Sequence, residues 1–184
     1  GRGVADRLMA RGVVAAGAAG DAGCLDGGYG AHCSRAVLPV RRALLEASGL
    51  DLASPLDGTD RTLGDALLEP TRIYVQPVRA ALLAHDGAIH ALAHITGGGL
   101  VDNLPRVLPD GVEVELAWGS WPEPPIYAPL RSCGIEEAEL RRTFNLGIGM
   151  VVIVDPEQAQ AVASTLQEAG EVVYEIGKVV GTSP

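Results

Sequence analysis

The stretch GIGMVVIVDPEQAQAVASTLQEAGEVVYEIGKVV, residues 147–180, decides the fold class. Within it, GMVVIVD is a continuous apolar run, typical of a strand covered on both faces. The next residues predict a complete helix, with Asp155 as the N-cap, Pro156 in the first position and Gly170 at the end. EVVYEIGKVV then predicts a last strand. The order of strand, helix and strand resembles one crossover unit.

Upstream of this stretch, further elements are expected in both classes. Residues 88–95 and 111–118 predict strands, the second with valines alternating against glutamates. Helices are expected at 36–48, in a short segment capped by Thr59 or Asp60 and ending at Leu68, and within 71–86. In the segment 71–86, Pro77 either kinks a helix that begins near Thr71 or occupies the first turn of one that begins at Gln76.

The mixture of elements predicts an α+β fold, a layered domain in which helices flank a mixed sheet. Residues 1–34 are rich in Gly and Ala and show neither a helical nor a strand period, so we expect an irregular linker or a disturbed segment there. Residues 35–184 are expected to form the domain. A length of 184 residues is in keeping with one domain.

The overall charge and the cysteines exclude several classes of protein. With 14 basic and 23 acidic residues the formal charge is −9, and no basic stripe of the kind that nucleic-acid binders carry is visible. No apolar run approaches the roughly 18 residues that a membrane span requires. Cys24, Cys33 and Cys133 lack a CxxC spacing, so we expect a reduced, cytoplasmic protein without a zinc site.

The segment HITGGGLVDNLPRV, residues 94–107, carries the first candidate site. Three glycines follow an apolar strand and precede a helical stretch, so we expect a strand-to-helix turn with the helix beginning between Gly98 and Val101 and ending near Val107. Free amides at such a turn can hold a phosphate or carboxylate. His94 and Thr96 could add a proton donor and a hydroxyl. The alternative is a tight loop with no ligand.

A second candidate site is RRTFNLGIGM, residues 141–150, in which Gly147 and Gly149 alternate at the entry to the apolar strand. Glycines on one face of a strand often mark the close approach of a ligand or of another backbone. Packing of a helix over the strand explains them equally well. Phe144, the one phenylalanine in the chain, is expected to be a core residue.

Together these motifs resemble a known family. LLEPTRIYVQPV, AHITGGGLVDNLPRVLP and RTFNLGIGMVVIV, in this order and spacing, are similar to the C-terminal half of phosphoribosylformylglycinamidine cyclo-ligase, also called aminoimidazole ribonucleotide synthetase. The resemblance covers about residues 36–180. It implies an enzyme of purine biosynthesis that closes the imidazole ring of formylglycinamidine ribonucleotide at the expense of ATP, and a cytosolic homodimer.

The resemblance also implies roles for residues. His94 and Thr96 would be catalytic. The substrate or its phosphate would be bound by a wider set, namely Gly97, Gly98, Gly99, Asn103, Arg106, Thr143, Asn145, Gly147 and Gly149. ATP and Mg²⁺ would be held mainly by the family's N-terminal domain, whose acidic motifs this sequence lacks, so we expect this chain to be a C-terminal part and inactive alone. No metal ligand is expected in it.

One stretch departs from the family pattern. Around residues 18–40 the chain reads DAGCLDGGYGAHCSRAVLPVRR where the family has a loop like SSGLHSNGYSLVR, so His32 is not equated with the histidine of that loop. A local reading-frame disturbance is our hypothesis for this stretch. Two other functions stay open: a phosphate- or nucleotide-binding module without turnover, and another member of the same superfamily, such as a selenophosphate, thiamine-phosphate or formylglycinamidine enzyme.

Overall fold

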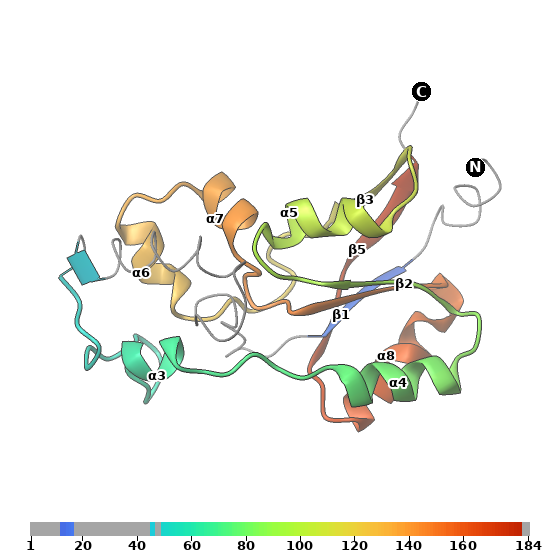
Figure 1. Cartoon of the computed structure of the whole chain (residues 1–184), viewed down its shortest axis with the longest axis horizontal. Coiled ribbons are helices and arrows are strands. Elements are labelled where there is room, and N and C mark those ends of the chain that lie inside the picture. Colours follow the sequence, from blue (N-terminus) through green and yellow to red (C-terminus); the bar gives the residue numbers. More distant parts are fainter. Residues whose placement is uncertain (1–11, 17–44, 47–48, 182–184) are drawn as a thin grey trace.

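The computed structural model describes residues 12–16, 45–46 and 49–181, and in this part of the chain five strands form one sheet (Figure 1). The strand order is β2-β4-β1-β5-β3. The strands are β1 (Gly12–Ala16), β2 (Ile89–His94), β3 (Val112–Leu116), β4 (Met150–Val154) and β5 (Val173–Gly181). Each neighbouring pair is antiparallel.

Helices cover both faces of the sheet and continue beyond one end of it. The helices are α3 (Leu63–Leu67), α4 (Val75–Ala84), α5 (Gly99–Asn103), η2 (Leu104–Val107), α6 (Tyr127–Ser132), α7 (Glu137–Thr143), η3 (Pro156–Gln158) and α8 (Ala159–Glu168). In Figure 1, α4 and α8 lie on one side of the sheet and α5 on the other, with α3, α6 and α7 grouped beyond its end. The predicted layered α+β fold is confirmed.

The unit that decided the fold class forms β4, α8 and β5, as predicted. Both strands run antiparallel to β1, which lies between them, so β4 and β5 are parallel to each other without being neighbours. The expected mixed sheet is therefore wrong in its pairing. β1 separates β4 from β5 and is antiparallel to both, and the outer pairs β2–β4 and β3–β5 are antiparallel as well. Residues 12–16 lie inside the segment expected to be irregular.

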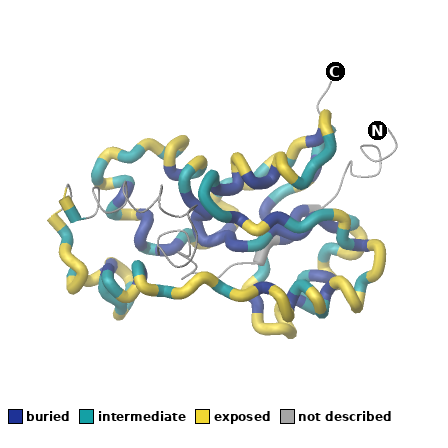
Figure 2. The backbone as a smooth tube through the Cα atoms, viewed as in Figure 1, coloured by how far each residue is buried: buried dark blue, intermediate teal, exposed yellow. Residues whose placement is uncertain are grey.

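Burial explains why β1 occupies the centre of the sheet. Val13 and Val14 are 0% and 2% exposed and point to opposite faces. Val13 joins the core under α5 and η2, where Ile95, Leu100 and Leu104 also lie. Val14 joins the core under α4 and α8. Figure 2 shows the buried positions concentrated along the strands and on the inner sides of the helices. The strand thus ties the two layers together.

The helix caps differ from the expected ones in two places. Thr62, not Thr59 or Asp60, caps α3: its Oγ1 accepts from Asp65 N at 3.1 Å, and Asp65 Oδ2 accepts from Thr62 N at 2.9 Å. These hydrogen bonds to Thr62 lower the pKa of Asp65. Asp155 precedes η3 but makes no capping bond; its Oδ1 instead lies 3.1 Å from His90 Nε2.

The structure tests the expected helix within residues 71–86 but hardly that at 36–48. α4 begins at Val75, so Pro77 lies in its first turn, where no backbone donor is required, and the second alternative for the segment 71–86 is the better one. The predicted helix 36–48 falls almost wholly outside the described residues, as do Cys24, Cys33 and His32. In the part of the chain that the structure describes, no helix has the length and hydropathy needed to cross a membrane.

Candidate functional site

The two glycine segments lie side by side in the structure. Ile95 N donates to Gly149 O at 2.8 Å, and His94 is the register partner of Met150 on the paired strands β2 and β4. Farther along, α5 passes so close to the end of α7 that a Cβ built on Gly99 would lie 2.2 Å from Arg141 O and 2.5 Å from Phe144 O. The chain thus brings together two motifs that are separated by about 50 residues in the sequence.

The TGGG segment forms the predicted strand-to-helix turn. β2 ends at His94, Gly98 is the N-cap of α5 with φ 103°, and η2 continues α5 to Val107. Such a φ is readily adopted only by glycine. The amides of Gly97 and Gly98 donate no hydrogen bond to any residue that the structure describes, and both residues are only partly buried. They are available to an anion, although α5 has only five residues and adds little dipole.

Asn103 holds this turn in shape. The side chain is 5% exposed, and its Nδ2 lies 2.8 Å from Gly99 O and 3.3 Å from both Thr96 O and Gly97 O. Its Oδ1 accepts from Thr96 Oγ1 at 3.5 Å and from Arg106 Nη1 at 3.4 Å. Asn103 therefore satisfies the carbonyls of Thr96, Gly97 and Gly99 from the buried side of the turn. Arg106, which is exposed, is the cation nearest in this network.

Asn145 plays the corresponding part in the second segment. Residues 145–148 form a turn closed by Ile148 N donating to Asn145 O at 3.0 Å, with φ 51° at Leu146 and 93° at Gly147, as in a type I′ turn. Asn145 Oδ1 accepts from Gly147 N at 3.1 Å and from Tyr127 OH at 3.0 Å. The turn is thereby fixed to α6.

Packing accounts for part of the glycine pattern, as the alternative interpretation expected. A Cβ on Gly147 would lie 2.7 Å from Pro124 Cδ, and Trp121 Nε1 donates to Leu146 O at 2.9 Å. Tyr127, Trp121 and Pro124 were not among the predicted site residues. They belong to a proline-rich stretch with no periodic pattern, so no signal in the sequence pointed to them. Gly99 and Gly147 are required by close contacts, whereas Gly98 meets only the side chains of Asp102 and Asn103.

Two predicted residues lie apart from this hydrogen-bond network. The His94 side chain is exposed, and its ring contacts that of Tyr74 edge-on with centroids 6.1 Å apart. It lines a cavity of about 550 Å³ beside α4. Thr143 Oγ1 donates to Glu139 Oε1 at 2.9 Å on the exposed side of α7. The structure thus groups Thr96, Gly97, Gly99, Asn103 and Arg106 in one hydrogen-bond network and Asn145 with Gly147 in another.

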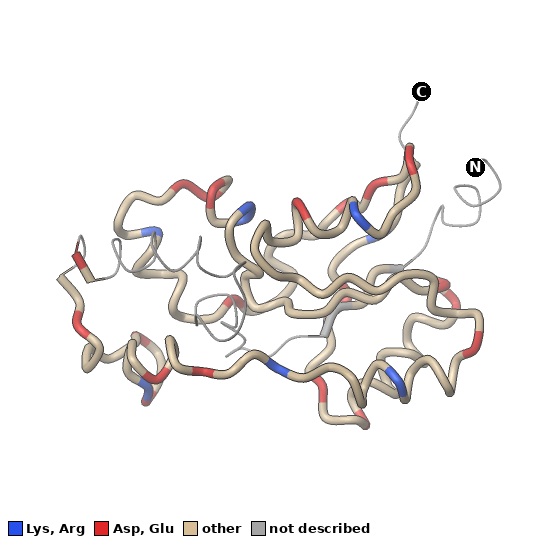
Figure 3. The backbone as a smooth tube through the Cα atoms, viewed as in Figure 1, with Lys and Arg blue, Asp and Glu red and all other residues tan. Residues whose placement is uncertain are grey.

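The described residues do not fit a magnesium site. None of them form a group of three or more His, Cys, Asp or Glu side chains that could hold a metal ion. Figure 3 shows Lys and Arg scattered among more numerous Asp and Glu.

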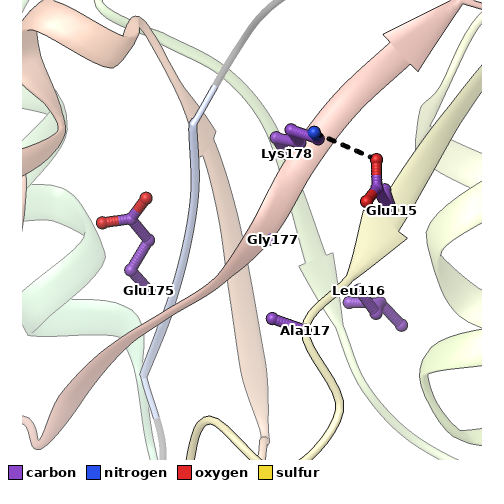
Figure 4. Close-up of a pocket in the computed structure, with 6 residues that line it drawn as sticks. All are labelled: Glu115, Leu116, Ala117, Glu175, Gly177 and Lys178. Atoms are coloured by element: carbon purple, nitrogen blue, oxygen red, sulfur yellow. Dashed lines mark ion pairs between the residues drawn. The ribbon is translucent and has the colours of Figure 1, made fainter.

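A second cavity of about 390 Å³ lies over β3 and β5 (Figure 4). Its Lys178 pairs with Glu115 at 3.2 Å while Glu175 points away from that pair, so this cavity offers an anion no free cation.

Comparison with known proteins gives one consistent family. Residues 30–183 match the family described as "AIR synthase related protein, C-terminal domain". Relatives from a Polaromonas species, Bacillus velezensis and Bacillus subtilis are 54%, 47% and 46% identical over 139, 141 and 141 residues, and each is named phosphoribosylformylglycinamidine cyclo-ligase. These stretches cover 75%, 76% and 76% of this chain. The chain spans only about two fifths of each relative's length, 39% to 40%.

Solved structures agree on the fold. A protein from Thermus thermophilus aligns with a TM-score of 0.54 at 23% identity, over 96% of this chain and 48% of that one. Thiamine-monophosphate kinase from Stenotrophomonas maltophilia aligns with a TM-score of 0.57 at 18% identity, over 95% and 49%. The match over residues 30–183, together with relatives that share about half of their aligned residues with it, shows that this chain belongs to the AIR synthase related family and carries its C-terminal domain.

Proposed function

We propose that this chain is the C-terminal part of a phosphoribosylformylglycinamidine cyclo-ligase, which closes the imidazole ring of formylglycinamidine ribonucleotide to give aminoimidazole ribonucleotide. One observation carries the proposal: the TGGG turn and the Asn145–Ile148 turn, both present in the matched segment, are joined by the Ile95–Gly149 hydrogen bond. The names of the relatives supply the reaction. This activity belongs to proteins more than twice as long as the shared stretch.

In the proposed reaction, ATP phosphorylates the formyl oxygen, the neighbouring amidine nitrogen attacks the same carbon, and phosphate leaves with that oxygen. The part assigned to this chain is binding. The free amides of Gly97 and Gly98, with Arg106 beside them, would hold a phosphate group of substrate or nucleotide, and Thr96 would offer its hydroxyl. Gly99, Asn103, Asn145, Gly147 and Gly149 would keep the two turns in register.

The catalytic roles predicted for His94 and Thr96, and the binding role of Thr143, stay proposals. ATP and Mg²⁺ would be held mainly by the N-terminal domain of the complete enzyme. The proposal places the complete enzyme in the cytoplasm, as a homodimer.

Turnover by the isolated chain is expected to be absent, because phosphoryl transfer depends on positioning and on metal electrostatics that this chain does not supply. Purified chain is incubated with ATP, Mg²⁺ and formylglycinamidine ribonucleotide, and the ring-closed product is measured by mass spectrometry. The Bacillus subtilis relative is the positive control. Robust product formation by the 184-residue chain alone would contradict this expectation.

A chimera tests the function itself. Residues 36–180 of this chain replace the matched stretch of the Bacillus subtilis relative, and ring closure is expected to be retained. Gly98→Val in the chimera should abolish most of it. A folded chimera that binds ribonucleotide without turning it over would instead support the alternative, a binding module without catalysis.

A further inference from the structure

The cavity of about 550 Å³ beside α4 is a feature that the proposed reaction does not explain. Its walls are mostly apolar and are formed by Ile73, Tyr74, Val75, Val78, Leu82 and Met150. Three of these side chains, Ile73, Val75 and Leu82, are 78%, 66% and 43% exposed, so they are free to contact a ligand. A concave site of about 300–1,000 Å³ with apolar walls and a few polar groups is typical of small-molecule binding.

The periodicity of α4 places one of its sides along the cavity. Val75, Val78, Arg79 and Leu82 follow the spacing i, i+3, i+4, i+7 and share that side. The opposite side is occupied, since Ala81 is 1% exposed and belongs to the core under α4 and α8. The apolar residues along the cavity are therefore not needed for packing α4 onto the domain.

Strand β2 adds a polar group to the cavity from the sheet. Side chains alternate between the two faces of a strand. Ala93 and Ile95 belong to the core under α5, whereas Leu92 packs against the core under α4 and α8. His94 accordingly lies on the same face as Leu92, on the side of the sheet where α4 lies, and it lines the cavity.

Charge indicates what the cavity binds. The formal charge of the chain is −9, yet the described residues that line this cavity include two arginines and no Asp or Glu. Arg72 is already balanced, because its Nε lies 2.8 Å from Oε2 of Glu171, whose side chain is 3% exposed. Arg79 is exposed and has no ion pair with any residue that the structure describes. The cavity thus combines apolar walls with one uncompensated positive charge.

We propose that this cavity binds a small aromatic carboxylate, with its ring against the apolar walls and its carboxylate on Arg79. A guanidinium can pair with a carboxylate through two parallel N–H···O bonds. The Met150 thioether and the Tyr74 ring are suitable neighbours for an aromatic ring.

Such a ligand differs from the substrate of the proposed reaction. A ribonucleotide carries sugar hydroxyls and a phosphate, for which the aliphatic walls offer no hydrogen bonds. Neither glycine turn lines the cavity. Binding by the cavity and ring closure by the complete enzyme can therefore each fail without the other.

The first test is a titration of the purified 184-residue chain with 2-naphthoate, followed by isothermal calorimetry. Saturable binding is expected, with a dissociation constant of about 1 mM or lower. The uncharged analogue 2-naphthalenemethanol should bind at least about tenfold more weakly, since it cannot pair with Arg79. A chain that does not bind 2-naphthoate, or that binds the alcohol equally well, overturns the proposal.

Variants of the chain locate the site. Arg79→Gln should weaken 2-naphthoate binding at least about tenfold. Arg142→Gln, at another exposed arginine, controls for the change in total charge. Leu82→Asp places a carboxylate on the cavity wall and should also weaken binding at least about tenfold, whereas Leu83→Asp, one residue on but outside the cavity lining, should not.

Circular dichroism checks that every variant is folded. Equal affinities of wild type and folded Arg79→Gln, or of the two aspartate variants, would disprove the assignment.

Two competitors test the class of ligand. ATP at about 1 mM should not displace 2-naphthoate, because the walls suit neither its ribose nor its phosphates. Displacement by ATP would contradict a separate ligand and would connect the cavity with the proposed reaction. 2-Naphthyl phosphate should bind no more than about tenfold more tightly than 2-naphthoate, since Arg79 is the one uncompensated cation among the described residues of the lining. A larger preference would show that the cavity selects phosphates and not carboxylates.

Discussion

Asn103 Nδ2 donates to Gly99 O at 2.8 Å and so joins the last residue of α5 to its first. The same amide group reaches the carbonyls of Thr96 and Gly97, so a single buried side chain organises the whole glycine turn. The shape of the candidate anion site is therefore set from the interior of the domain. The effects of substitutions in this interior can be measured separately from the effects of substitutions on the face that would contact a ligand.

Asn103→Leu, which keeps the branched shape and the number of heavy atoms but removes the donors, is expected to lower the free energy of unfolding by about 1–3 kcal/mol, the usual cost of leaving a buried polar group unsatisfied. Phosphate affinity should fall as well, because the loop amides lose their common orientation. Urea unfolding and isothermal titration with inorganic phosphate measure the two effects. Val101→Ala, at an exposed position of the same helix, serves as the control and should change neither.

Gly98→Val is expected to damage anion binding more than folding. At φ 103° a β-branched residue is strained by about 1–3 kcal/mol. Its Cβ would also lie 2.8 Å from Asp102 Cβ, so the exposed first turn of α5 must shift slightly, but no backbone atom is among its nearest contacts. The valine would cover the free amides. Unfolding midpoint and nucleotide affinity are compared on the same variant. Unchanged affinity with a collapsed midpoint would assign the glycine to the scaffold.

Gly99→Ala is expected to damage folding more than anion binding. Its Cβ would overlap the carbonyl oxygens of Arg141 and Phe144, which are backbone atoms and cannot rotate away. Separating α5 from α7 is expected to cost about 2–4 kcal/mol, by overpacking combined with positive-φ strain. Thermal unfolding measures this loss. A variant as stable as wild type would show that α7 moves freely and that the contact is not a constraint.

Leu146 adopts φ 51° although it is not glycine, and its side chain is 0% exposed. Removing the side chain should cost about 2–5 kcal/mol, while relieving the backbone recovers only about 1–2 kcal/mol, so both Leu146→Ala and Leu146→Gly are expected to be destabilised. The glycine variant should be the more stable of the two by roughly 1 kcal/mol. Chemical denaturation of the two variants isolates the contribution of the backbone to the free energy of unfolding. An alanine variant as stable as the glycine variant, or more stable, would contradict the prediction.

The ion pairs of Glu137 predict how the stability of the domain depends on pH. Its hydrogen bond to Arg131 lowers the pKa of this carboxyl, and Arg141 contributes further. A lowered folded-state pKa means that the stabilisation is complete above the ordinary carboxyl pKa and is lost as the pH falls through the folded-state value. Glu137→Gln should therefore cost at most about 1 kcal/mol at neutral pH, as for partly exposed pairs, and nothing in strong acid. Unfolding curves of wild type and Glu137→Gln are measured at several pH values. A difference in the free energy of unfolding that persisted in strong acid would refute the prediction.

Local chemistry within the sequence determined β4, α8, β5 and the TGGG turn. An apolar run, a proline at a helix start and a glycine at its end act over a few residues, and three successive glycines permit one tight turn. The resemblance of the motifs to a known family was likewise readable from the chain and is confirmed by the match over residues 30–183.

Contacts between distant residues decided the rest. Five residues of β1 carry too little pattern to signal a strand, and only burial of Val13 and Val14 between two helical layers places them at the centre of the sheet. His94 turns toward Tyr74 and α4 rather than toward Thr96 because it is fixed by the pairing of β2 with β4. Tyr127 at the start of α6 meets Asn145, which is 18 residues away and follows the end of α7. Such positions follow from the packing of whole elements, which no short-range pattern encodes.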